Sequence, residues 1–326
     1  MKNILFTLVI ILCFISCSKS EDIILNPTDS FYRQEMRQFI IDLSQYSKIQ
    51  KPGFKIIPQN GIQLSTIDGE ITSVPSRNYL NAIDGISQEG LFYGYENDDL
   101  ATPQSISTYF KSYLNVSKNQ GKTILITDYC ASTSNVNNSY FKNEQSGYVS
   151  FSANQRFLTS IPTFPNPIFH QNNTVVSELS DVKNFILLLN FENFNSKADF
   201  ISAITATNYD LVVLDLYFRN RSEFTVADLN QIRNKANGGK RLIFSYVSIG
   251  EAEDYRYYWQ LNWNATPPIW LDAENPNWTG NYKVRYWQPE WQQIIYGNDA
   301  SYMKKIIDSG FDGVYLDLVD AFWFYE

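Results

Sequence analysis

Cysteine and histidine are scarce in this sequence of 326 residues, and their scarcity excludes several kinds of site. There are three cysteines and one histidine, and only Cys130 lies beyond the N-terminal segment. A disulfide framework within the fold is therefore excluded, and so is a cysteine-based metal site. The single histidine, His170, excludes a two-histidine zinc motif, and nothing around it indicates a Ser-His-Asp triad. We expect neither a metal nor a cofactor.

Positive charge is also in short supply. Lysine and arginine together number 26 against 34 aspartates and glutamates, which gives a net charge of −8. Binding to nucleic acid needs clustered basic residues, so we expect no nucleic-acid partner. We also expect the chain to be a monomer. Aromatic residues make up 16% of the chain. They could form a large core or a surface on which sugars stack, and composition alone favours the core.

Long apolar runs are missing as well. The most apolar run, from Ile4 to Ile15, is too short to span a bilayer. It ends in Ser16-Cys17 and is followed by polar residues, a pattern typical of a bacterial lipoprotein signal in which Cys17 would carry the lipid. A plain secretory signal is the alternative. We predict a signal peptide over residues 1–17, a tether over 18–30, and a lipid anchor that holds the protein at the cell envelope.

The remaining chain alternates short apolar runs with helical patterns. Helical periodicity is expected over 32–46, 105–116, 227–235 and 300–309. The eight strand candidates are 54–57, 81–86, 123–126, 147–150, 185–189, 211–214, 242–245 and 313–316. Nearly continuous apolar strands between helices favour a parallel sheet, and its natural closed form is a (β/α)8 TIM barrel. We expect one barrel over 31–326, with a proline-rich connector around 156–180. An open doubly wound sheet is the alternative.

In such barrels the site lies at the carboxyl ends of the strands. The residues that follow the apolar runs are mostly carboxylates and amides: Gln59, Asn60, Gln88, Glu89, Asp128, Tyr129, Asp215, Tyr246, Ser248, Glu251, Glu253, Asp254, Asp317 and Asp320. Carboxylates alone can hydrolyse glycosides, and they could also bind a hard cation such as calcium. Each carboxylate taken singly could instead cap a helix or pair with a base.

Six of the seven tryptophans lie in one long insertion, between Trp259 and Trp291. A loop of this length in a compact domain usually has a function, although its aromatic residues could also form a small core of their own. We expect both roles.

Several segments together resemble glycoside hydrolase family 114, the endo-α-1,4-polygalactosaminidase-like barrels. The segments are 56–61 (IIPQNG), 83–93 (IDGISQEGLFY), 245–256 (SYVSIGEAEDYR), 270–272 (WLD), 286–291 (YWQPEW) and 310–320 (GFDGVYLDLVD). In that family the strand of the last segment is the fourth, and the strands of the first two follow it as fifth and sixth. Here the later strands come first. The resemblance therefore implies a circularly permuted barrel, in which the family's strands 5–8 precede strands 1–4.

The resemblance also implies roles for individual residues. Asp317 and Glu89 match the family's catalytic pair, with Asp317 expected as the nucleophile and Glu89 as the acid/base. Six residues are expected to hold the sugar: Asn60, Asp128, Asp215, Tyr246, Glu253 and Asp320. The implied activity is hydrolysis of an α-linked amino-sugar polysaccharide outside the cytoplasm. Two alternatives remain: a non-catalytic surface glycan-binding lipoprotein, and a cation-dependent envelope protein.

Overall fold

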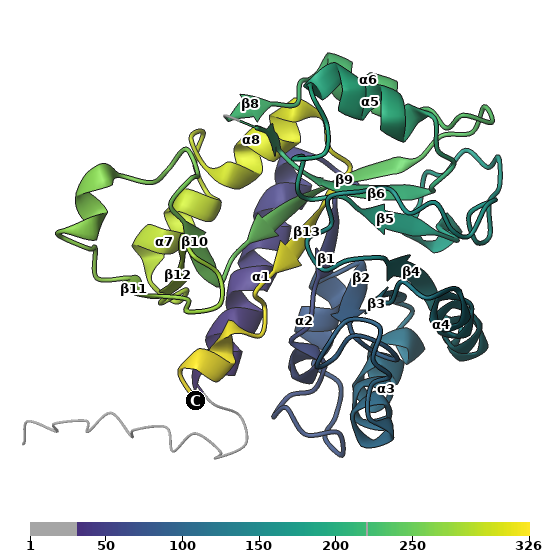
Figure 1. Ribbon diagram of the computed structural model, residues 1–326. Helices are drawn as coiled ribbons and strands as arrows, with labels where there is room; N and C mark the ends of the chain where they lie inside the picture. The colour runs from purple at the N-terminus through teal and green to yellow at the C-terminus, as the bar shows by residue number, and fades with distance from the viewer. Residues whose placement is uncertain (1–30, 220) are drawn as a thin grey trace, which may run out of the picture.

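The computed structural model describes residues 31–219 and 221–326 (Figure 1). The expected signal peptide, the tether and Cys17 lie outside these residues. Within them the chain folds as an α/β protein whose central strands are parallel. Their bounds are β1 (Lys55–Pro58), β2 (Gly85–Glu89), β3 (Thr123–Tyr129), β4 (Val149–Ala153), β5 (Phe185–Leu187), β6 (Leu211–Asp215), β9 (Leu242–Ser248) and β13 (Gly313–Asp317).

The parallel strands form two sheets. One has the order β1-β13-β9-β6-β5, and the other has the order β2-β3-β4. The two sheets meet at β1 and β2, where Gln59 and Ser87 form a parallel bridge and the Asn60 amide donates to the Ser87 carbonyl at 2.8 Å. Strand β4 lies beside β5, where Phe151 packs against Phe185. All eight expected parallel strands are therefore present, with shifted boundaries.

The described residues form eight α-helices, of which α7 lies beside β10 and β12 (Figure 1). They are α1 (Phe31–Gln50), α2 (Arg77–Ala82), α3 (Gln104–Asn119), α4 (Thr133–Ser146), α5 (Lys197–Thr205), α6 (Val226–Ile232), α7 (Pro289–Ile295) and α8 (Tyr302–Ser309). Short 3-10 helices are η1 (Ile62–Ser65), η2 (Leu179–Asp181), η3 (Leu261–Asn264) and η4 (Ala321–Phe324). The buried face of α1, including Met36, Phe39 and Leu43, joins the main core.

The start of α1 lies against the segment that follows β13. The Arg33 guanidinium pairs with the Glu326 carboxylate at 2.9 Å and stacks on the ring of Trp323 at 4.6 Å. The Tyr286 hydroxyl donates to the Tyr32 carbonyl at 2.7 Å. Since β13 ends at Asp317, α1 begins near the carboxyl ends of the strands and runs back toward the start of β1.

Two expected strands begin later than the apolar runs predicted. Residues 81–82 end α2, and the strand starts at Gly85, after Asp84, whose carboxylate accepts from the Ile56 amide of β1 at 2.9 Å. The run 147–150 starts in a helix end: Gly147 has φ 66° and closes α4, and β4 begins at Val149. Left-handed backbone of this kind favours glycine, which explains the stop.

The long insertion is not a plain loop. Strands β10 (Glu251–Glu253), β12 (Asn281–Val284) and β11 (Leu271–Glu274) form an antiparallel sheet that stands out as a lobe on the left of Figure 1. Trp263, Trp270 and Trp291 are buried in it, and their rings contact one another in sequence. A second hairpin, β7 (Tyr217–Phe218) and β8 (Ser222–Glu223), follows β6.

Candidate active site

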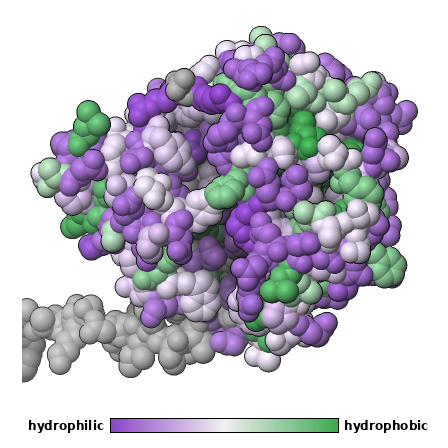
Figure 2. Space-filling view, in the orientation of Figure 1, coloured by the Kyte–Doolittle hydropathy of each residue, from purple (hydrophilic) through white to green (hydrophobic). Residues whose placement is uncertain are grey.

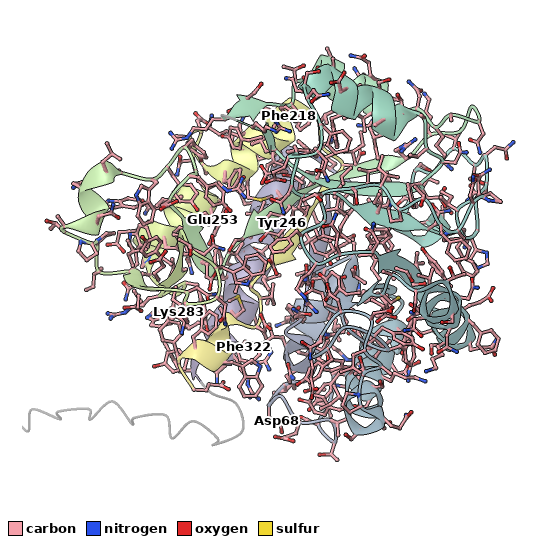
Figure 3. The ribbon with its side chains drawn as sticks, viewed as in Figure 1. Asp68, Phe218, Tyr246, Glu253, Lys283 and Phe322 are labelled. Atoms are coloured by element: carbon pink, nitrogen blue, oxygen red, sulfur yellow. The ribbon has the colours of Figure 1, made fainter. Side chains whose placement is uncertain are left out.

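A cavity of about 1030 Å³ lies at the carboxyl ends of the parallel strands. Its floor consists of strand-end residues, and one wall is the β10–β12 lobe, which contributes Glu253 and Asn281. Figure 2 shows the corresponding hollow between this lobe and the rest of the molecule. In Figure 3, Tyr246 of β9 and Glu253 of β10 lie close together beside it. The insertion therefore helps to build the site.

Asp317 is the last residue of β13 and reaches into this cavity. Its Oδ2 accepts from the Tyr246 hydroxyl at 2.7 Å, and its Oδ1 accepts from the Leu318 amide at 2.8 Å. Burial, followed by the negative charge of Glu89, raises the pKa of Asp317 to about 8 against the two hydrogen bonds, which lower it. The pKa of Asp317 therefore depends on the charge of Glu89.

Glu89 is the last residue of β2 and lines the same cavity. Its Oε1 accepts from the Tyr129 hydroxyl, and its Oε2 lies 3.5 Å from Nδ2 of the Asn60 side chain. Asn60 is itself fixed, since its Oδ1 accepts from the Gln88 side chain at 3.1 Å and from the Glu89 amide at 3.3 Å. Each member of the expected catalytic pair is therefore held by a tyrosine hydroxyl from a neighbouring strand.

Asp215 and Glu253 line the cavity around a shared cation, Arg256. Arg256 Nη1 lies 2.6 Å from Asp215 Oδ2, and Arg256 Nε and Nη2 both donate to Glu253. Burial raises the pKa of Asp215, and the nearby Arg256 opposes that rise. The hydroxyl of Tyr255 also donates to Glu253. The structure therefore makes Arg256 the group that fixes two of the expected sugar-binding carboxylates.

Asp320 lines the cavity just beyond Asp317. Burial is the main reason that its pKa is raised to about 6, and the charges on Glu89 and Glu251 add to it. Glu251 is buried and accepts from the Asn275 side chain at 2.7 Å, and burial raises its pKa as well. The cavity thus collects carboxyl groups whose protonation is favoured by burial.

Asp128 does not reach the cavity. Its side chain is fully buried; Oδ1 accepts from the Phe92 and Tyr93 amides, and Oδ2 accepts from Ser139 and Asn143 of α4. Successive residues of a strand point to opposite faces, so Tyr129 faces the cavity and Asp128 faces the helices. Asp128 was expected to hold the sugar, and here it anchors α4 and the 92–93 loop instead.

The backbone next to the carboxylates is unusual. Leu318 has φ 57°, a region that costs a non-glycine residue roughly 1–3 kcal/mol, and this conformation points its amide at Asp317. Gly250 packs against this turn so closely that a Cβ there would lie 2.3 Å from the Leu318 carbonyl oxygen. The turn that follows β13 therefore leaves no room for a side chain at position 250, which explains why Gly250 stands there.

Several cavity residues were not among the expected sugar-binding residues, and Tyr129, Arg156 and Trp323 are examples. Alternation along β3 could have identified Tyr129. Arg156 comes from the connector, and its guanidinium stacks over the Tyr129 ring at 4.1 Å; no local pattern marks it. Asp272 does not line the cavity and pairs with Arg285 at 3.0 Å.

Within residues 31–219 and 221–326, no group of three or more metal-ligating side chains is placed to hold an ion. No helix in the same residues has the length and apolarity needed to cross a bilayer.

The fold and the cavity define a class: an α/β protein with parallel strands whose strand ends present carboxyl groups to a cavity of about 1030 Å³. Residues 191–324 match the model of glycoside-hydrolase family GH114, so this part of the chain is similar to that family. The segment includes Asp215, Tyr246, Glu253, Asp317 and Asp320.

Three similar curated proteins are all described as uncharacterized. One from Methanocaldococcus jannaschii is 43% identical over 152 residues, which cover 47% of this chain and 41% of that protein. One from Thermotoga maritima is 40% identical over 119 residues, 36% and 35% of the two chains. One from Deinococcus radiodurans is 38% identical over 122 residues, 37% of each. The aligned part thus spans only about two fifths of the length of these relatives.

Proposed function

We propose that this protein hydrolyses an α-linked amino-sugar polysaccharide through the carboxyl pair Asp317 and Glu89. The observation that carries the proposal is their convergence. They end two strands that are separated by β1, yet they line one cavity, and each accepts a hydrogen bond from a tyrosine hydroxyl. Glycoside hydrolysis needs such a pair, one carboxyl to protonate the leaving oxygen and one to face the anomeric carbon.

Asp317 is assigned as the nucleophile and Glu89 as the acid/base. The Tyr246 hydroxyl and the Leu318 amide both donate to Asp317, and both stabilise the anion that a nucleophile needs. The pKa of about 8 opposes this role at neutral pH. During the reaction, positive charge develops at the anomeric carbon, next to the Asp317 carboxyl group. This charge favours the anion and so lowers the pKa of Asp317. As an Asp317 oxygen bonds to the anomeric carbon, the glycosidic bond breaks and the proton of Glu89 goes to the departing oxygen. Water then attacks the anomeric carbon and gives its proton to Glu89, which breaks the bond to Asp317, releases the sugar and restores both carboxyl groups.

The charge of the cavity supports an amino sugar. Its lining among the described residues includes seven carboxyl groups and four guanidinium groups. Arg256 is already neutralised by Asp215 and Glu253, and Arg219 donates to three backbone carbonyls. Arg156 pairs with Asp98 at 3.0 Å. The surplus of negative charge favours a substrate that carries ammonium groups.

The proposed architecture is a closed, circularly permuted barrel. Support for closure comes from the contacts of β1 with β2 and of β4 with β5, and from the hydrogen bond of 2.6 Å between Tyr315 of β13 and Ser87 of β2, which face each other across the interior. Support for permutation comes from chain order: the strand with Asp317 comes last, and α1 begins beside it. A variant that joins residues 326 and 31 and opens the 156–180 connector should fold and stay active.

The proposed location is the cell envelope, with lipid on Cys17. Because α1 begins near the carboxyl ends of the strands, the tether would enter at the cavity side. Residues 18–30 could extend at most about 45 Å at ~3.5 Å per residue, which holds the cavity near the membrane. Metabolic labelling with a fatty acid should mark the wild type and not Cys17→Ser. Label on both proteins would contradict the anchor.

The test of the activity is reducing-end release from a panel of α-linked polysaccharides that includes partially deacetylated polygalactosamine. Wild type should release reducing ends, and Asp317→Asn and Glu89→Gln should not, with folding checked by circular dichroism. Tight binding of one glycan without release would favour a glycan-binding protein. Release that survives both substitutions would mean that the pair lies elsewhere. Loss of release on chelation would favour a cation-dependent protein.

A further inference from the structure

A second, smaller cavity of about 370 Å³ lies beside the first. The two cavities share five lining residues: Asn60, Glu89, Arg156, Asp320 and Trp323. They are therefore adjacent, and Glu89 lies at their junction. Asp317 lines only the larger cavity. The smaller cavity continues the binding surface past Glu89, on the side away from Asp317.

The far wall of the smaller cavity is aromatic, and much of it is exposed. Tyr95 is 47% exposed and Tyr109 is 41% exposed, and both contact the ring of Phe110. The Tyr109 hydroxyl is fixed by the Gln63 side chain at 2.7 Å. At the junction Trp323 is 50% exposed, and Arg33 stacks on it at 4.6 Å. Ring faces that stay exposed while their neighbours are fixed are suited to stacking against a ligand.

The smaller cavity is also lined by polar groups. Amide side chains from Asn60, Gln63 and Gln88 lie around the rings, with the carboxyl groups of Glu89 and Asp320 at the side of the larger cavity. A pyranose ring offers an apolar CH face for the aromatic rings and hydroxyl or ammonium groups for the amides and carboxylates. A flat hydrophobic ligand would offer no hydrogen-bond partner to the carboxyl groups of Glu89 and Asp320, which line the cavity.

We propose that the smaller cavity is a saccharide subsite that binds the leaving-group side of the polysaccharide through Tyr95 and Tyr109. This rests on the proposed function, in which Glu89 protonates the leaving oxygen. The part of the chain bonded to that oxygen lies on the side of Glu89, and the smaller cavity extends the site there without Asp317. The bound chain thus crosses the pair, with sugar units on both sides, and cleavage falls within the chain.

The experiment uses α-1,4-linked galactosamine oligomers of increasing length. Wild type should gain kcat/KM with each unit that enters the smaller cavity, and the double variant Tyr95→Ala/Tyr109→Ala should lose about tenfold or more of that gain, where tenfold is ~1.4 kcal/mol. The shortest cleaved oligomer should be affected least. Tyr95→Phe should retain the length dependence, because the ring remains. Phe141→Ala, an exposed aromatic on α4 that lines neither cavity, is the matched control.

Binding of the same oligomers to the Asp317→Asn variant, measured by calorimetry, separates the two proposals. Affinity that rises with length and falls in the double variant supports the subsite even if no glycan is cleaved, in which case the hydrolase proposal alone fails. Cleavage with an unchanged length dependence in the double variant overturns the subsite and leaves the hydrolase proposal standing. Absence of both cleavage and length-dependent binding overturns both.

Discussion

The aspartates at the two ends of the parallel strands differ in their partners. Asp84, Asp210 and Asp312 each immediately precede a strand. Each accepts at least one backbone amide, from Ile56, Lys183 and Ile243 respectively. Each also pairs with a cation, and those cations are Lys48, Lys235 and Arg233. At the amino ends, carboxylates join neighbouring strands and are compensated in charge.

The carboxyl ends are arranged differently. Among the residues that the structure describes, Asp317, Asp320 and Glu89 form no ion pair, and the groups that donate to Asp317 and Glu89 are hydroxyls and amides. Burial raises the pKa of Asp317 to about 8 and that of Asp320 to about 6. Asp317 and Asp320 therefore lack the cations that the three aspartates at the amino ends have, whereas Asp215, at the carboxyl end of β6, keeps one in Arg256. Carboxyl groups whose pKa is raised in this way are typical of catalytic sites.

Breaking a compensated pair at the amino ends should have the largest effect on stability. Lys235 and Asp210 are 2.5 Å apart, and both side chains are completely buried. Lys235→Met leaves a buried carboxylate without its cation and should lower the free energy of unfolding by about 3–5 kcal/mol. Urea unfolding followed by circular dichroism measures this. Lys305→Met, which removes a partly exposed pair with Glu223, is the control and should cost about 1 kcal/mol or less. Equal losses would contradict the comparison.

Asp128 sharpens the comparison, because it lies at the carboxyl end of its strand but has four donors and no access to the cavity. Asp128→Asn turns one acceptor into a donor facing Ser139 and Asn143, and should lower the free energy of unfolding by about 1–3 kcal/mol. Turnover per folded molecule should be unchanged. A loss of turnover at full stability would show that Asp128 acts on the substrate.

The stability of Asp317→Asn should depend on pH in a specific direction. The folded pKa of about 8 lies above the ordinary value of 3.8, so the folded state binds more protons between these values. The stability of the wild type therefore falls as pH rises from about 4 to 8 and then levels off. Asparagine has no such cost, so the variant should melt several degrees higher than wild type at pH 9.

The difference should vanish as pH falls toward 4, and melting curves from pH 4 to 9 measure it. Asp320→Asn is the matched control, with a smaller gain that is complete near pH 6. A gain that is constant over the pH range would contradict the assignment.

Tyr246→Phe should have the smallest effect. It removes one hydrogen bond that stabilises the Asp317 anion and leaves the Leu318 amide in place. The apparent pKa of the rising limb of kcat/KM should be near 8 in wild type and higher by about one unit in the variant, which corresponds to ~1.4 kcal/mol. A falling limb near pH 8 that Tyr246→Phe shifts upward would exchange the roles of Asp317 and Glu89.

Much of the fold could be predicted from the sequence because nearly continuous apolar runs mark buried parallel strands. The starts of β2 and β4 were harder to predict, since residues 81–82 still belong to α2 and the left-handed backbone of Gly147 ends α4. The site was partly accessible: position after a strand brings Glu89 and Asp317 together. The same rule failed for Asp128, where alternation decides the direction of the side chain.

Arg156 and the small sheet of the insertion could not be foreseen, because both depend on contacts between distant segments. Arg156 comes from the connector and meets Tyr129 of β3. Strands β10 and β12 pair with each other although a long segment with η3 and β11 separates them in the sequence. Local periodicity carries no information about either contact.

The most direct test compares Asp317→Asn with Asp312→Asn, the same substitution at the two ends of β13. Reducing-end release from a cleaved α-linked glycan and unfolding in urea at pH 7 are measured for both variants. The account predicts that Asp317→Asn loses roughly 10²–10⁴-fold or more in turnover without losing stability. Asp312→Asn, which weakens the contact with Arg233 and the Ile243 amide, should lose stability and retain turnover per folded molecule. Retained turnover in Asp317→Asn, or equal loss of turnover in both variants, would contradict it.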